Sequence, residues 1–175
     1  VSVSVDMPRI SGVPMEPKAC SATYDAATGM YDVYAPTQGM SMMVHSLSGG
    51  TGVPADKIRV HALDVGGGFG VRSDGYSEFC SIMLAAKKVG RPVRWSGSRS
   101  ETIISDHHGR GAKMTGELAL DENGRILGIR ANSMHAVGSH VTPAAFATSM
   151  FSVKLLSGVY DIPAGFIAAK AIFTN

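Results

Sequence analysis

Hydrophobic residues recur along the chain with two different periods, and the longer one is that of a helix. Met40 and the apolar residues three, four and seven positions after it share one helical face, and Gly49, Gly50 and Gly52 are expected to end this helix. Ser98 and Glu101 have the spacing of a capping box. Three further helices are predicted over residues 75–89, 98–107 and 144–156.

The shorter period is the alternation of apolar and polar residues in a strand. Ala27-Thr28-Gly29 and Asn123-Gly124 are turn signals, and each predicts a hairpin. By contrast, Pro8, Pro14 and Pro17 indicate a loop over residues 1–20. The predicted strands cover residues 22–25, 31–34, 58–64, 93–95, 113–120, 126–134 and 166–173.

These elements predict an α+β fold made of two small lobes, each a mixed sheet covered by helices. Residues 1–20 form a leading loop in this interpretation. The first lobe comprises residues 21–108 and contains a glycine-rich loop, and the second comprises 109–175 and is expected to be truncated at its end. The boundary between the two lobes is placed near Gly109 to Gly111, where the pattern of predicted elements changes.

Composition excludes several classes of protein. Of the 175 residues, 45% are hydrophobic and 17% are charged, so a core can be buried and disorder is not expected. The net charge is only +2, with basic residues scattered, which does not favour nucleic-acid binding. No apolar stretch is long enough to span a membrane. Cys20 and Cys80 form no metal-binding pair and favour a reducing compartment, the cytoplasm. The histidines also lack metal-ligand spacing: His45, His61, His107, His108, His135 and His140.

The segment Asp64–Gly70, which reads Asp-Val-Gly-Gly-Gly-Phe-Gly, is the first candidate for chemistry. Consecutive glycines let a ligand approach the backbone closely. The dinucleotide-binding fingerprint fails, since Val71 stands where its last glycine belongs, and no Walker sequence follows. Two readings stay open: a ligand-binding loop, or a turn whose glycines only ease packing.

Two polar side chains near predicted turns are further candidates. Gln38 lies where a strand leads into a helix, so its amide can donate to a ligand or simply face solvent. Glu16 stands between Pro14 and Pro17, which favour an extended backbone. Its carboxylate either orients a neighbouring lobe or belongs to the surface.

Taken in order, these segments resemble the molybdenum hydroxylases, the family of xanthine dehydrogenase and aldehyde oxidase. The similarity is greatest to the large subunit of aerobic carbon monoxide dehydrogenase and its relatives. It is carried by Pro14–Pro17, Thr37-Gln38, Asp64–Gly70, Gly90–Trp95 and Ser98–Glu101, and it continues in Gly116–Asp121 and Gly158–Pro163.

The resemblance implies roles for residues of this chain. Gln38 would donate a hydrogen bond to the oxo ligand of molybdenum, and Phe69 would lie near the metal. Gly67, Gly68 and Gly70 would place their backbone against the cofactor, as glycines permit. No residue of this chain is expected to ligate the metal. Arg72 stands where many members have lysine, and Ser73 where purine-oxidising members have glutamate, which does not favour purine recognition.

The resemblance also implies a larger complex. The cofactor would be molybdenum bound to molybdopterin cytosine dinucleotide, in an enzyme that hydroxylates carbon monoxide, an aldehyde or an N-heterocycle. Electrons would pass to a 2Fe-2S cluster on a small subunit and FAD on a medium subunit, in a dimer of heterotrimers. The family's active-site loop and general base would lie beyond Asn175, so the isolated chain is expected to be inactive. Two alternatives remain: a noncatalytic scaffold lobe of the same fold, and a nucleotide-binding domain.

Overall fold

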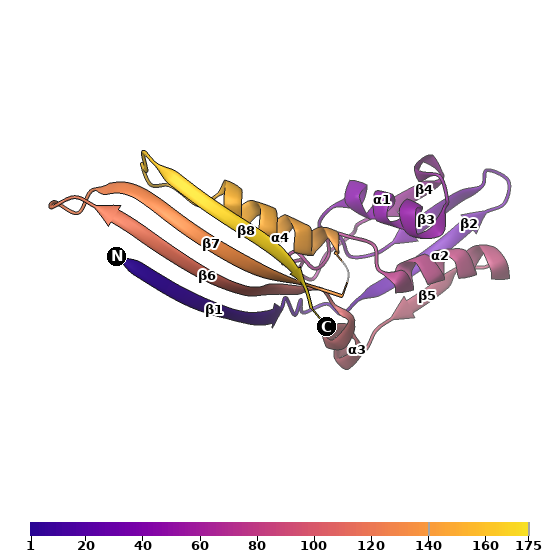
Figure 1. Cartoon of the computed structure of the whole chain (residues 1–175). Coiled ribbons are helices and arrows are strands. Elements are labelled where there is room, and N and C mark those ends of the chain that lie inside the picture. Colours follow the sequence, from indigo (N-terminus) through magenta and orange to yellow (C-terminus); the bar gives the residue numbers. More distant parts are fainter. Residues whose placement is uncertain (140, 175) are drawn as a thin grey trace. The chain divides into compact units, whose positions relative to one another are not determined.

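The computed structural model describes residues 1–139 and 141–174. His140 and Asn175, both named above, lie outside the described residues. The chain forms two compact units, one of Gly12–His107 and one of Val1–Ser11 with the chain from His108 onward. Each unit has a four-stranded mixed sheet, so the predicted α+β class is confirmed (Figure 1).

The sheet of the unit Gly12–His107 has the order β4-β3-β2-β5. The hairpin of β2 (Ala19–Asp25) and β3 (Met30–Tyr34) is antiparallel as predicted, whereas β3 and β4 (Ile58–His61) run parallel. A parallel neighbour needs a crossover, which α1 (Met40–Thr51) and a short 3-10 turn (Ala55–Lys57) supply. The carboxyl ends of β3 and β4 therefore lie side by side at the same end of the sheet. The edge strand β5 spans Val93–Ser96.

Helix α1 runs further than its sequence predicts. Gly49 and Gly50 lie inside the helix, which ends at Gly52 in the left-handed conformation, with φ +73°. The expectation that Gly49 and Gly50 end it was wrong. Packing explains Gly50: a Cβ there would lie 2.9 Å from the Sγ atom of Cys80, so the glycine lets α1 approach α2.

The core of this unit lies between the sheet and the helices α1 and α2 (Ser77–Val89). Helix α2, predicted over residues 75–89, buries Phe79, Met83 and Ala86. They pack with Met43 and Leu47 of α1 against the sheet. Helix α3 (Arg99–Ser105) begins with the predicted capping box, because the Glu101 N–H donates to Ser98 Oγ and the Ser98 N–H donates to Glu101 Oε2.

The second sheet has the order β1-β6-β7-β8. It contains β6 (His108–Leu120), β7 (Ile126–Gly138) and β8 (Gly165–Phe173). Strand β1 (Ser2–Ser11) corrects the expectation of a loop over residues 1–20. It is an edge strand paired with β6, and Pro8 is tolerated there because its missing N–H need not bond a neighbour.

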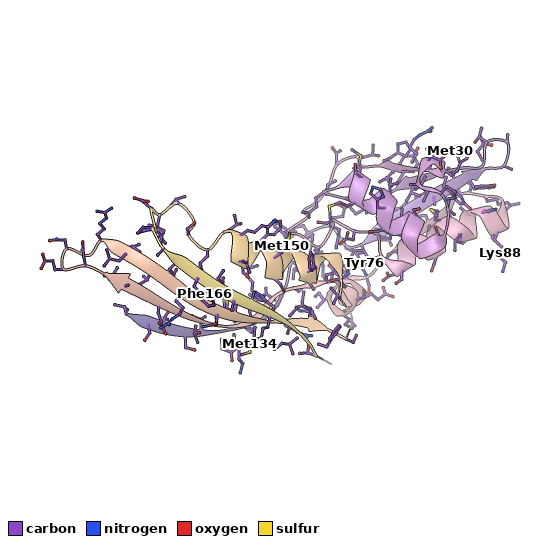
Figure 2. All side chains as sticks on the ribbon, turned by 45° about the horizontal axis from the view of Figure 1, so that its top comes forward. Met30, Tyr76, Lys88, Met134, Met150 and Phe166 are labelled. Atoms are coloured by element: carbon purple, nitrogen blue, oxygen red, sulfur yellow. The ribbon has the colours of Figure 1, made fainter. Side chains whose placement is uncertain are left out.

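Helix α4 (Pro143–Lys154) covers one face of this second sheet. His135 is buried on that face, and its Nε2 lies 3.1 Å from Ser152 Oγ of α4. Met134 faces the other way and is 45% exposed, while Met150 belongs to α4 (Figure 2). Within the described part of the chain, no helix is long and apolar enough to cross a membrane.

Candidate functional site

The glycine-rich loop follows β4 and lies at the end of the sheet where β3 and β4 both terminate. Gly67, Phe69 and Gly70 have positive φ angles of 109°, 51° and 87°. Glycine adopts such angles readily, but phenylalanine rarely does. The Phe69 residue is also 74% exposed, so its ring lies at the surface of the unit and not in the core.

The helix after the loop begins only at Ser77, so the glycines are not part of its first turn. A dinucleotide or phosphate turn would place them there, against the positive end of the helix. This geometry counts against the nucleotide-binding alternative.

Two glycines of the loop lie directly against side chains of the protein. A Cβ on Gly66 would lie 2.5 Å from the Cβ of Glu16, and one on Gly68 would lie 2.3 Å from Oε1 of Gln38. Real Cβ atoms do not come this close to other atoms, so neither position accepts a side chain without movement. The glycines therefore bring the loop into direct contact with Gln38 and Glu16.

Glu16 holds the first part of the loop. Its backbone N–H donates to the Gly66 carbonyl at 3.2 Å, and its Oε2 accepts the Gly66 N–H at 2.7 Å. Arg99 fixes the same segment, because its guanidinium donates to the carbonyl of Pro14 at 2.7 Å. Sequence reasoning left the role of Glu16 open, and the prolines beside it were the only signal of a fixed carboxylate.

Gln38 holds the second part of the loop. Its Oε1 accepts the Gly70 N–H at 2.9 Å, and its own backbone N–H donates to the Arg72 carbonyl at 3.0 Å. A backbone N–H can only donate, so the oxygen of the amide must face Gly70. The NH₂ group of Gln38 is then the end that remains to donate to a ligand.

Three successive N–H groups of the loop have no acceptor among the described residues. The N–H groups of Gly66, Gly70 and Val71 bond to Glu16, Gln38 and Gly68. Those of Gly67, Gly68 and Phe69 do not bond to any described residue. Adjacent N–H groups form a concave site in a turn that combines right-handed and left-handed backbone conformations. Such a site attracts anionic oxygen.

A buried ionic cluster lies beside the loop. Arg72 is fully buried, and its Nη1 lies 2.9 and 3.0 Å from the two carboxylate oxygens of Asp106. The Tyr76 hydroxyl, near the start of α2 (Figure 2), donates to Asp106 Oδ1 at 2.5 Å. Burial, followed by the hydrogen bond and charge of Asp106, raises the pKa of Tyr76, so the phenol keeps its proton.

The sequence-predicted site residues thus meet in one place. Gln38 contacts Gly68 and Gly70 directly, and Gly67 and Phe69 belong to the same loop. Sequence reasoning missed the contacts of Glu16 and Arg72, because their partners lie far from them along the chain.

The chain is similar to known proteins over its whole length. The family of molybdopterin cofactor-binding domains matches residues 1–175. The carbon monoxide dehydrogenase large chain of Hydrogenophaga pseudoflava is 33% identical, over 100% of this chain and 22% of its own. The 6-hydroxypseudooxynicotine dehydrogenase complex subunit gamma of Paenarthrobacter nicotinovorans is 31% identical, over 95% of this chain and 21% of its own.

Among solved structures, quinoline 2-oxidoreductase from Pseudomonas putida 86 matches with a TM-score of 0.88 and 28% identity. The match covers 99% of this chain and 22% of that protein chain. This chain therefore spans about a fifth of the length of the relatives it matches.

Proposed function

Because this chain belongs to the family of molybdopterin cofactor-binding domains, we propose that Gln38 and the loop Gly67–Gly70 bind the molybdenum cofactor of an oxidoreductase. The observation that carries the proposal is the row of N–H groups at Gly67, Gly68 and Phe69, which have no acceptor among the described residues. Such donors suit the anionic oxygens of a cofactor. The fit is good, since the loop has no side chain at its glycines to hold a ligand away.

Each residue has a distinct part in this proposal. Gln38 donates from its NH₂ group to an oxo ligand of molybdenum, while its Oε1 stays on the Gly70 N–H. Phe69, whose ring is exposed, would lie near the metal when the cofactor is bound. Gly67, Gly68 and Gly70 carry the backbone against the cofactor. The cofactor, when bound, supplies two-electron redox chemistry, and the protein binds and orients it.

The proposal also covers the whole enzyme, of which this chain would be one part. The similarity to a carbon monoxide dehydrogenase large chain supports an enzyme that hydroxylates carbon monoxide, an aldehyde or an N-heterocycle. We include molybdopterin cytosine dinucleotide as the cofactor, a 2Fe-2S small subunit and an FAD medium subunit as partners, and a dimer of heterotrimers. The relative named as subunit gamma of a complex supports such partners. Cys20 and Cys80 are both free thiols, which supports a cytoplasmic location.

Metal and pterin analysis of the intact enzyme tests the cofactor assignment. We expect about one molybdenum and one pterin per copy of this chain, as one binding domain requires. The cytosine base is identified by chromatography of the nucleotide released on acid treatment. An intact, folded enzyme that contains neither molybdenum nor pterin would overturn the proposal and favour the noncatalytic scaffold.

A further inference from the structure

We propose that Arg72 is a positioning residue that sets the place of the Gln38 amide relative to the glycine loop. The inference rests on the proposed function, because it concerns how the cofactor-binding groups are held. Among the described residues, the side chain of Arg72 donates to Val71, Asp106 and Glu16. It acts through other residues and is not itself a catalytic residue.

The side chain of Arg72 connects three segments that are distant in sequence. Its Nη1 donates to the Val71 carbonyl at 3.0 Å and to both oxygens of the Asp106 carboxylate. Its Nη2 lies 3.4 Å from the carbonyl of Glu16. A guanidinium is a rigid, planar group with several donors, so it fixes the relative positions of its acceptors.

The backbone of Arg72 holds a fourth segment, the one that carries Gln38. Its carbonyl accepts the Gln38 N–H at 3.0 Å and the Thr37 hydroxyl at 2.9 Å. The end of the glycine loop, the backbone of Glu16 and the backbone of Gln38 therefore all bond to this one buried residue. Movement of Arg72 would change the distance between the Gln38 amide and the three free N–H groups.

The hydrogen bonds of Tyr76 strengthen the arrangement. Its hydroxyl lies 2.7 Å from the Val71 carbonyl and 2.5 Å from Asp106 Oδ1, so it shares both of these acceptors with Arg72. The side chains of Arg72 and Asp106 are 0% and 1% exposed, which leaves little room for water to replace a lost bond.

A second ion pair in the same unit, made by a buried lysine and a glutamate that is 29% exposed, offers a control. Lys18 Nζ lies 2.8 Å from Glu78 Oε1, and Lys18 is fully buried like Arg72. Within the part of the chain that the structure describes, the Glu78 side chain bonds to Lys18 and Ser77 and to no residue of the loop or Gln38. Glu78→Gln should therefore weaken folding through lost ion pairing without moving the loop.

The experiment compares variants of the intact enzyme by hydrogen exchange and by the molybdenum EPR spectrum. In Arg72→Met we expect the hydrogen-bonded amides of Gly66, Gly70 and Val71 to exchange about tenfold faster, with a changed EPR spectrum. Arg72→Lys should recover much of the difference, since a lysine can still reach the Asp106 carboxylate as a point charge. Glu78→Gln should lower the melting temperature while both readouts stay like wild type.

A double variant separates positioning from stability if Arg72→Met does not fold. Arg72→Met with Asp106→Asn leaves no unpaired buried charge, so folding should recover, whereas the donors that hold Val71 and Glu16 remain absent. Faster loop exchange in this variant supports positioning. Wild-type loop exchange and a wild-type EPR spectrum in the double variant would overturn it. If the wild-type enzyme holds no molybdenum, the proposed function fails, and loop exchange alone decides the role of Arg72.

Discussion

Glu16 and Gly66 are bonded to each other twice, once through their backbones and once through the Glu16 carboxylate. The pair closes a small ring that joins the segment after Pro14 to the start of the glycine loop. A side chain on Gly66 would break it, since its Cβ would lie 2.5 Å from that of Glu16. The loop is thus fixed at its start by Glu16 and near its end by Gln38.

The Glu16 carboxylate should contribute to folding through this bond. Glu16→Ala removes the acceptor of the Gly66 N–H, and we expect the free energy of unfolding to fall by about 0.5–1 kcal/mol, because water can reach this exposed bond. Glu16→Gln retains an amide oxygen in the same place and should cost less than half as much. Denaturant titration of the chain measures both. Equal losses in the two variants would show that the oxygen acceptor is not what matters.

Gln38→Glu tests the direction of the Gln38 amide. The substitution keeps an oxygen for the Gly70 N–H but replaces the outward NH₂ donor with a negative oxygen. In the intact enzyme we expect turnover to fall by the equivalent of about 2–4 kcal/mol, as for other preorganised donors. Loop exchange should stay like wild type. A fully metallated Gln38→Glu enzyme with wild-type turnover would refute donation from the Gln38 amide.

The two glycines inside α1 should respond differently to alanine. Gly49→Ala should stabilise the chain by about 0.5–1 kcal/mol, because a Cβ there meets nothing within 4 Å and the unfolded chain loses freedom. Gly50→Ala should gain little, since its Cβ would lie 2.9 Å from Cys80 Sγ. Thermal melts report both. Adding Cys80→Ala should restore the gain to Gly50→Ala, and failure to do so would exclude that contact as the cause.

His135 should make stability depend on pH below neutrality. Burial lowers the pKa of His135 from its usual value of 6.5, so the folded state disfavours the charged imidazole. Between 6.5 and that lower pKa the unfolded chain binds more protons, and folding stability falls as the pH falls. Above 6.5 this contribution is constant. Unfolding curves of wild type and His135→Gln from pH 8 to pH 5 should therefore converge on acidification; parallel curves would contradict the lowered pKa.

Local patterns predicted the elements that depend on neighbouring residues. The capping box of Ser98 and Glu101, helix α2 and the hairpin of β2 and β3 all follow from residues close in sequence. Strand β1 was missed because its partner β6 lies far along the chain, and because Pro8 reads as a loop signal. Pairing with a strand far along the chain depends on tertiary contacts. The alternation of apolar and polar residues within one segment does not predict such contacts.

The candidate site divides in the same way. Gln38 and the glycine loop were singled out by their residue types and by family resemblance, and they do meet. Their contact through Gly70 was not predictable from spacing, since it depends on β3 and β4 being parallel neighbours. The buried pair of Arg72 and Asp106 joins residues 34 positions apart and carries no local pattern.

The parallel pairing of β3 and β4 has a consequence for how this protein tolerates change. The segment with Gln38 follows β3 and the glycine loop follows β4, so both leave the sheet at the carboxyl ends of these strands. The turn at Gly29 and the connection at Gly52 lie at the opposite ends of the strands. Insertions at Gly29 or Gly52 would lengthen the far side of the sheet and leave the register of Tyr34 with His61 intact. Such positions are where tags, probes or natural length variation can be accommodated without disturbing the cofactor loop.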